Sequence, residues 1–309
     1  MTRDEILQAF DRIRVWQSGG QRAPHKPLLI LLALGRLVRG EPPMAEFSEL
    51  EEKLKELLTD FGPSSAPASR HYPFWHLASD RFEKDSPLWE LAGPAEILNR
   101  PRGTAPNLGE LRARHIFGGF PEPLRRALLS DPALISEIAH RLLESHFPGT
   151  LRQDVLDAVG LSIDDTSAAL MDTQSRRRRD PAFRGKVLLA YEYRCCVCGF
   201  DLRLGRQSVG LEAAHIKWFQ AGGPDVETNG LALCALHHKI FDLGAFTVRP
   251  EDGFMVFSRH MMGSLDVQDR QLAHHGSSLI HPQSKEFAPD PAFLDWHRRW
   301  VFKEPARAI

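Results

Sequence analysis

Hydrophobic residues recur at helical spacing along the first half of the chain. Ile6, Phe10 and Ile13 would share one face of a helix, and Thr2 with Glu5 forms a capping box at its start. Similar patterns predict further elements over these ranges: helices at 28–37, 47–58, 108–115, 122–130 and 132–146, with short strands near 72–78 and 87–92. The pattern therefore predicts a mostly helical domain over residues 1–150.

A second domain is expected over residues 181–309, and a linker over 151–180 would join it to the first. The linker offers few apolar side chains to bury and contains four consecutive arginines at 176–179. Such a block is typical of a solvated linker, although its place directly before a cysteine motif favours contact with DNA phosphates. The second domain mixes short helices and strands, so the whole chain is expected to belong to the α+β class.

Composition narrows the function classes. The chain has 309 residues, 42% of them hydrophobic and 26% charged, which is normal for a globular protein with two domains of ordinary size. Its formal net charge of −1 excludes a uniformly basic protein that coats DNA. The longest apolar stretch, 27–38, is interrupted by Arg36 and is too short to span a bilayer. The charged N-terminus is unlike a signal peptide, so a cytoplasmic protein is expected.

All four cysteines lie between positions 195 and 234. Two residues separate Cys195 from Cys198, and two residues separate Cys234 from His237. Each short turn would deliver two ligands to one side of an ion, which suits tetrahedral zinc. Cys196 lies inside the first turn, where the geometry favours its neighbours, and we interpret it as a packed thiol. The spacing therefore predicts a structural zinc site.

Three further residues accompany this cluster. A short predicted strand, 211–216, carries His215, and Asn229 and His238 follow at spacings of 14 and 9. Over about residues 178–244 these residues and the interleaved zinc ligands resemble the HNH endonuclease family, in the subset with a zinc-containing core. The resemblance implies a ββα-metal fold for the C-terminal domain and hydrolysis of phosphodiester bonds in DNA. It also implies that His215 is the general base, a task that suits a neutral imidazole near pH 7.

The same resemblance implies one catalytic Mg²⁺ or Mn²⁺ at the scissile phosphate. Asp242 lies four residues after His238 on a predicted helix, so both side chains can reach one ion. Ala214 stands where many members of the family have an acidic or histidine ligand. Either Asp242 and His238 suffice to hold the ion, or Glu212 joins them from the same strand. Asn229 is expected either to hold the connecting loop or to orient the general base by a hydrogen bond.

Three clusters in the first domain combine cations with proline, glycine or aromatic residues: His25-Lys26-Pro27, Arg70-His71-Tyr72-Pro73 and Arg102-Gly103. Taken over about residues 1–150, they resemble the sulfur-binding domain of type IV restriction endonucleases, which recognises phosphorothioate-modified DNA. A sulfur atom is larger and less strongly hydrated than the phosphate oxygen it replaces. A partly apolar pocket would therefore favour sulfur, because burying oxygen there costs more desolvation free energy.

The resemblance assigns a role to each of these residues. Tyr72 and Pro73 would form the apolar wall, and His25, Lys26 and Arg102 would neutralise the phosphate. Gly103 would allow close approach of the backbone. Arg70 and His71 would reach base edges in the groove. Two simpler interpretations stay open. The first cluster is also the pattern of a helix start, and the aromatic cluster is also the pattern of a core strand.

Together these features predict a modification-dependent restriction endonuclease that acts on double-stranded, phosphorothioate-modified DNA. One HNH site cuts one strand, so cleavage of both strands suggests a homodimer. Two alternatives remain. The first is an HNH endonuclease directed to 5-methylcytosine, and the second is a non-catalytic, zinc-containing DNA-binding protein, which the alanine at position 214 favours.

Overall fold

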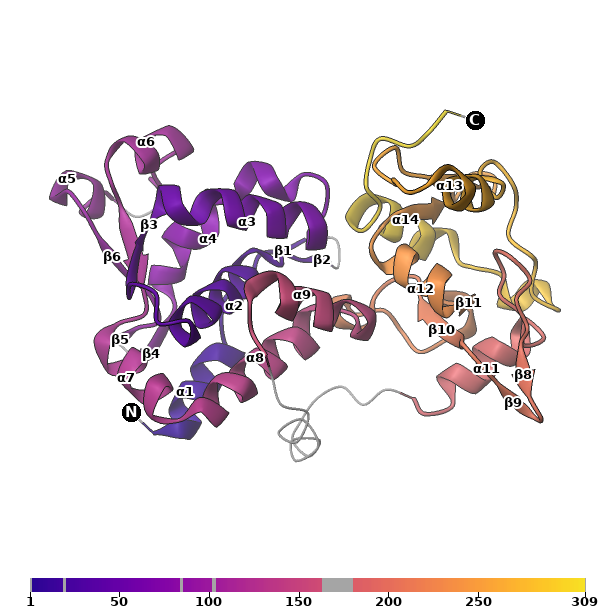
Figure 1. Ribbon diagram of the computed structural model, residues 1–309, viewed down its shortest axis with the longest axis horizontal. Coiled ribbons are helices and arrows are strands. Elements are labelled where there is room, and N and C mark those ends of the chain that lie inside the picture. Colours follow the sequence, from indigo (N-terminus) through magenta and orange to yellow (C-terminus); the bar gives the residue numbers. More distant parts are fainter. Residues whose placement is uncertain (1, 19–20, 84–85, 102–103, 163–179, 309) are drawn as a thin grey trace. The chain divides into compact units, whose positions relative to one another are not determined.

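The computed structural model describes residues 2–18, 21–83, 86–101, 104–162 and 180–308, which are coloured along the chain in Figure 1. They form two compact units. The first contains the described residues of Met1–Phe147 and Arg152–Gln174, and the second contains those of Pro148–Leu151 and Ser175–Ile309. Each unit has its own hydrophobic core.

Helices dominate the first unit. They are α1 (Arg3–Asp11), α2 (His25–Val38), α3 (Phe47–Phe61), α4 (His71–His76), α5 (Ala95–Leu98), α6 (Leu108–Ala113), α7 (Glu122–Ser130), α8 (Pro132–His146) and α9 (Arg152–Val159), with the 3-10 turns η1 (Ala66–Ser69) and η2 (Leu77–Ser79). The strands are β1 (Gln17–Ser18), β2 (Gln21–Arg22), β3 (Met44–Glu46), β4 (Arg81–Glu83), β5 (Ser86–Pro87), β6 (Glu90–Ala92) and β7 (Phe117–Gly119). They form one antiparallel sheet in the order β3-β7-β6 and two hairpins, β1-β2 and β4-β5.

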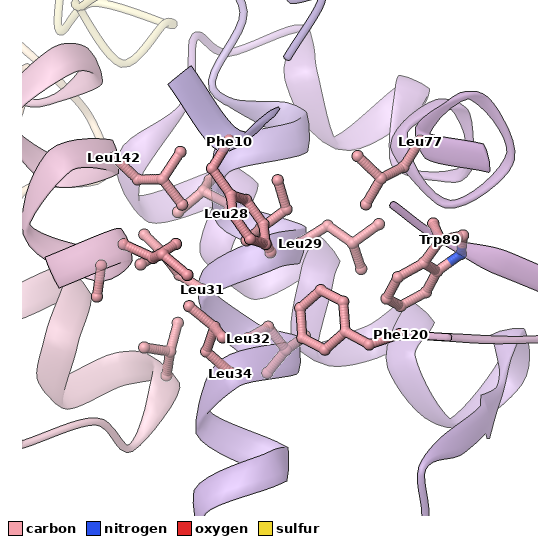
Figure 2. Packing of buried hydrophobic residues seen from close by; sticks show 14 of the residues in the cluster. Phe10, Leu28, Leu29, Leu31, Leu32, Leu34, Leu77, Trp89, Phe120 and Leu142 are labelled. Carbon is pink, nitrogen blue, oxygen red and sulfur yellow. The ribbon is translucent and has the colours of Figure 1, made fainter. Parts of the chain in front are cut away.

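Helix α2 lies at the centre of this first core. It packs against α3, α4, α7, α8 and α9, and its leucines meet Phe10 of α1 and Trp89 in Figure 2. Leu28 and Leu29 are fully buried, as expected for a helix that is apolar on nearly every side. The capping box of α1 is present, because the Thr2 hydroxyl accepts from Glu5 N and the Glu5 carboxylate accepts from Thr2 N.

The range 72–78 is helical, so the predicted strand there is wrong. Phe74 and Leu77 are both fully buried and stand three residues apart, which places them on one face of α4 and η2. Aromatic residues favour strands in isolation, but here packing against α2 determines the conformation.

The expected linker begins with ordered structure. Helix α9 buries Val155, Leu156 and Val159 and packs against α2 and α3. Gly35 makes this approach feasible, since a Cβ atom at that position would lie 2.1 Å from the Val159 carbonyl oxygen. The arginine run 176–179 lies outside the described residues.

The second unit contains helices α11 (Phe183–Ala190), α12 (Ala235–Asp242), α13 (Leu265–Leu272) and α14 (Pro291–Trp300), and the 3-10 turns η3 (Gly149–Leu151), η4 (Phe219–Ala221), η5 (Glu227–Asn229) and η6 (Lys285–Phe287). Its strands pair as three antiparallel hairpins: β8 (Arg203–Leu204) with β9 (Gln207–Ser208), β10 (Leu211–His215) with β11 (Gly230–Cys234), and β12 (Phe246–Val248) with β13 (Met255–Phe257).

Strands β10 and β11 and helix α12 make the ββα arrangement that the sequence predicted. The register pairs Leu211 with Cys234 and His215 with Gly230. Helix α11 packs across both strands, and its Val187 side chain lies so close to Gly230 that a Cβ atom there would come within 2.3 Å. The hairpin therefore brings the end of β10 beside the start of β11, and α12 follows directly.

Candidate active site and metal centre

Four side chains of the second unit converge on one point. They are Cys195 and Cys198 in the turn after α11, Cys234 at the end of β11, and His237 in the first turn of α12. Their ligand atoms all lie within 4.8 Å of one another. The nearest contact joins Cys234 Sγ to His237 Nδ1 at 3.1 Å. These four residues could hold a metal ion, and they are the four that the spacing predicted.

A residue that the sequence did not indicate supports this cluster. Gln271 of α13 accepts a hydrogen bond from His237 Nε2 at 2.9 Å, so the lone pair of the neutral ring lies on Nδ1, the atom that faces the thiols. Cys196 is fully buried outside the cluster. The hydrogen bond with Cys234 lowers the pKa of Cys195 to about 3, whereas burial raises that of Cys196 well above its usual value. Cysteine binds metals as the thiolate, the form that this hydrogen bond favours at Cys195.

His215 stands at the end of β10, where two neighbours fix its ring. Its Nε2 lies 2.7 Å from Asp225 Oδ1, and the ring stacks on Phe183 with centroids 4.1 Å apart and planes 17° from parallel. Asp225 Oδ2 in turn accepts from the backbone N–H of Asp180 at 2.7 Å. Asp225 was not predicted, because its only signal in the sequence is an acidic side chain between His215 and Asn229.

Asn229 is fully buried and holds the loop between the two strands. Its Oδ1 accepts from Lys217 N at 2.8 Å, while Nδ2 donates to Lys217 O at 3.0 Å and to Pro224 O at 2.9 Å. Gly223 lies against this amide, because a Cβ atom there would come within 1.8 Å of Lys217 O. The geometry matches the first of the two roles expected for Asn229, that of holding the loop.

His238 lies on α12 between two carboxylates. Its Nδ1 is 2.5 Å from Glu212 Oε2, and its Nε2 is 3.3 Å from Asp242 Oδ2. Burial lowers the pKa of His238, but the hydrogen bonds and charges of Asp242 and Glu212 outweigh it and raise the pKa to about 9. Asp242 is almost wholly buried and also accepts from Trp218 Nε1 at 3.1 Å, whereas the Glu212 side chain is 46% exposed. The pair of carboxylates therefore favours a positive charge at this position.

In the first unit, the starts of α2 and α4 lie together. His25 Nε2 donates to Ala66 O at 3.2 Å, and burial lowers the pKa of His25. Lys26 forms an ion pair with the buried Asp80 carboxylate, which also binds Arg14 Nε at 3.3 Å. Lys26, which the sequence predicted as a cation at the DNA phosphate, is thus largely enclosed and already paired with a carboxylate.

The cluster at the start of α4 is partly exposed. Arg70 forms an ion pair with the buried Glu51 at 2.7 Å, so its guanidinium is directed into the unit. The ring of Tyr72 is 48% exposed and lies against His71, with centroids 4.3 Å apart, while Pro73 is buried behind it. Helix α4 contacts α2, and His25 at the start of α2 bonds Ala66 of η1, the turn that precedes α4. Arg102 and Gly103 lie outside the described residues.

Two family models match the chain. Residues 3–164 match the ScoMcrA-like DNA sulfur-binding domain, and residues 195–249 match an HNH endonuclease domain. No curated protein matches. Among the described residues, no helix is long and apolar enough to cross a membrane.

Several solved structures are similar to the chain. One is the sulfur-binding domain of ScoMcrA complexed with phosphorothioated DNA, at 25% identity and a TM-score of 0.43, covering 50% of this chain and 94% of that one. Another is the corresponding domain of SprMcrA with such DNA, at 22% identity and a TM-score of 0.40, covering 52% and 95%. The type IV phosphorothioation-dependent restriction endonuclease ScoMcrA matches at 24% identity and a TM-score of 0.43, covering 57% of this chain but only 32% of that one.

The N-terminal match spans half of the chain, and the HNH match spans β10, η5 and α12, which carry His215, Asn229 and His238. The chain therefore belongs to the ScoMcrA-like DNA sulfur-binding domain family and carries an HNH endonuclease domain in its C-terminal half.

Proposed function

We propose that this protein is a restriction endonuclease that recognises phosphorothioate-modified DNA and hydrolyses phosphodiester bonds near the modification. The observation that carries the proposal is the presence of both domains in one chain, a sulfur-binding domain over 3–164 and an HNH endonuclease domain over 195–249. The first would select the DNA and the second would cut it.

The reading surface would lie where α2 and α4 begin. The exposed face of Tyr72, backed by Pro73, offers an apolar wall, which favours a weakly hydrated sulfur atom over an oxygen. Lys26, Arg14 and Asp80 together carry one net positive charge, which would attract the phosphate anion. Because Lys26 is paired with Asp80, the site holds no unpaired buried cation when DNA is absent. His25 and His71 would contribute donors, and Arg70 would support α4 through Glu51. Arg102 and Gly103 remain part of the proposed site on the strength of the sequence.

In the nuclease domain, His215 would act as general base and accept a proton from the attacking water. A divalent ion, Mg²⁺ or Mn²⁺, would supply Lewis-acid stabilisation of the charge that develops on the phosphate. The donor types present fit such an ion, because the His238 imidazole lies between the Glu212 and Asp242 carboxylates. Glu212 and His238 would hold it from the exposed side, and Asp242 would orient His238 from behind.

The four-residue cluster would hold zinc in a structural role. Three sulfur atoms and one imidazole nitrogen form a donor set typical of closed, tetrahedral zinc sites. The ion would tie the turn after α11 to the junction of β11 and α12, next to the position of His238.

Cleavage of both DNA strands would require two HNH sites, so we also propose that the protein acts as a homodimer on DNA. The measurement is the mass of the complex with a modified duplex by light scattering. A stoichiometry of two chains per duplex would support the dimer, and one chain per duplex with both strands cut would refute it.

The proposed selectivity is tested with matched oligonucleotide duplexes that carry a phosphorothioate, no modification or 5-methylcytosine. The proposal predicts that the parent binds the phosphorothioate duplex most tightly, as followed by fluorescence anisotropy. Tyr72→Ala should lose this preference, whereas His215→Ala should retain it and lose cleavage. Tighter binding of the methylated duplex would indicate that the first domain recognises 5-methylcytosine and not sulfur. Cleavage by His215→Ala would refute the catalytic assignment of His215.

A further inference from the structure

We propose that Asp225 is a positioning residue for His215: it accepts the Nε2 proton and so directs the basic nitrogen, Nδ1, to the attacking water. This inference rests on the proposed role of His215 as general base. It concerns a residue that belongs to neither the zinc cluster nor the His-Asn-His set, and it assigns a function to the loop between β10 and β11.

The hydrogen bond itself fixes the tautomer. His215 Nε2 and Asp225 Oδ1 are 2.7 Å apart, and their side chains are only 13% and 11% exposed. An ionised carboxylate can accept but cannot donate, so Nε2 must carry the hydrogen atom. In a neutral imidazole the lone pair then lies on Nδ1, which makes Nδ1 the nitrogen that can take a proton.

Asp225 is itself held in place from two directions. Its second oxygen accepts from the backbone N–H of Asp180 at 2.7 Å. The preceding residue, Pro224, offers its carbonyl oxygen to Asn229 Nδ2 at 2.9 Å. The buried asparagine therefore positions the carboxylate through one peptide unit, and the carboxylate positions the imidazole. This chain of contacts gives Asn229 a connection to catalysis without contact with the reacting atoms.

Stacking restricts the remaining freedom of the ring. Phe183 of α11 covers one face of the His215 ring at 4.1 Å and 17°, and Phe219 lies 6.0 Å away at 55°. The stack restricts the plane of the ring, and the Asp225 hydrogen bond selects one of the two flipped orientations that share this plane. The imidazole is thus held in a single orientation before DNA binds, which lowers the entropy that must be lost in the transition state.

The hydrolytic step balances with these groups. The water oxygen forms a bond to phosphorus, the bond from phosphorus to the 3′ oxygen breaks, and the proton of the water moves to His215 Nδ1. The departing oxygen takes a proton from solvent, and the imidazolium later returns its proton to solvent. The Asp225 carboxylate stabilises the imidazolium that forms, which is the role of a carboxylate hydrogen-bonded to a histidine base.

The first experiment observes the parent protein directly. Ring nitrogen shifts of ¹⁵N-histidine-labelled full-length protein, with His215 assigned by its absence in His215→Gln, report which nitrogen carries hydrogen. We expect His215 to be the Nε2–H tautomer. A ring protonated on Nδ1 alone would overturn the proposal, whether or not DNA is cut.

The second experiment uses Asp225→Asn, with Glu227→Gln as a control that removes the same charge from the same loop. The asparagine amide can donate to Nε2 and thereby move the ring hydrogen to Nδ1, so we expect kcat to fall about 100-fold or more with little change in KM. The His215 nitrogen shifts should also change in Asp225→Asn. The control Glu227→Gln should match the parent in both kcat and nitrogen shifts. An Asp225→Asn rate within about threefold of the parent would refute the proposal. If His215→Ala also cleaved at the parental rate, the proposed function would fail instead.

Discussion

His297 couples the stability of the nuclease unit to pH. Its ring is fully buried in α14, stacked on Phe241 with centroids 3.7 Å apart and planes 3° from parallel. Nε2 lies 3.1 Å from the Phe241 carbonyl oxygen, which can only accept, so Nε2 carries the hydrogen. Nδ1 then accepts from the Thr247 hydroxyl at 2.8 Å. Both nitrogens therefore have hydrogen-bond partners when the ring is neutral. Among the described residues, no acidic group lies within hydrogen-bonding distance of the ring to stabilise its charged form.

The size of the coupling follows from the pKa. Burial is the dominant cause that lowers the pKa of His297 from 6.5 to about 4, against smaller opposing effects of Phe241 O and Asp242. The unfolded chain takes up this proton as pH falls below about 6.5, but the folded protein does so only near pH 4. Stability is therefore fully present above pH 6.5 and is lost as pH falls through this window. The loss is about 2 kcal/mol at pH 5 and about 3 kcal/mol at pH 4.

The assay compares pH dependence in matched variants. His297→Gln keeps a donor for the Phe241 carbonyl but cannot titrate, and His281→Gln removes an exposed histidine as a control. Urea-dependent hydrogen exchange, resolved by peptides of the second unit, gives the free energy of opening for that unit in the full chain. Between pH 7 and 5, we expect His297→Gln to lose about 2 kcal/mol less than the parent, after any constant offset is removed. Equal losses in the two proteins would refute the account of His297.

Two further predictions concern the metal cluster. Cys198→Ser should lose the bound zinc, as measured by mass spectrometry of the metal content. Cys196→Ser should keep the zinc, because that thiol lies outside the cluster. Zinc retained by Cys198→Ser would contradict the ligand assignment. Gln271→Ala should weaken zinc binding by about 10- to 100-fold in a competition with a chelator, since it removes the acceptor that fixes the His237 ring. Parental affinity in this variant would show that the hydrogen bond has no effect on the ion.

The parts of the structure that follow from local sequence could be predicted. The capping box depends only on Thr2 and Glu5, which are three positions apart. Helix α2 could be predicted because its apolar run is nearly continuous, which indicates a buried helix. The metal cluster could also be predicted from local sequence. Each pair of its ligands lies on one short turn, and the hairpin of β10 and β11 needs only to bring the two turns together.

The parts that depend on distant contacts could not be predicted. The pairing of Lys26 was not predicted, because its partner Asp80 is 54 positions away and comes close only when α2 packs against α4. Gln271 reaches His237 across 34 positions. Nothing in the sequence around Asp225 distinguishes it from a solvated turn residue, because its role depends on the loop that Asn229 folds.

The aromatic cluster at 71–76 shows a different limit. Its residues favour strands by intrinsic preference, and the spacing of Phe74 and Leu77 was too short a pattern to distinguish a helix. Packing on α2 determines the helical conformation and leaves Tyr72 exposed on the surface.

The central claim is that one chain both recognises sulfur in DNA and cuts that DNA. The most direct measurement is cleavage of two plasmids of identical sequence, one phosphorothioate-modified and one plain, in the presence of Mg²⁺ or Mn²⁺. The account predicts that only the modified plasmid is cut and that His215→Ala cuts neither. Equal cleavage of both plasmids would contradict sulfur-dependent selection, and no cleavage of either would contradict the proposed nuclease of modified DNA.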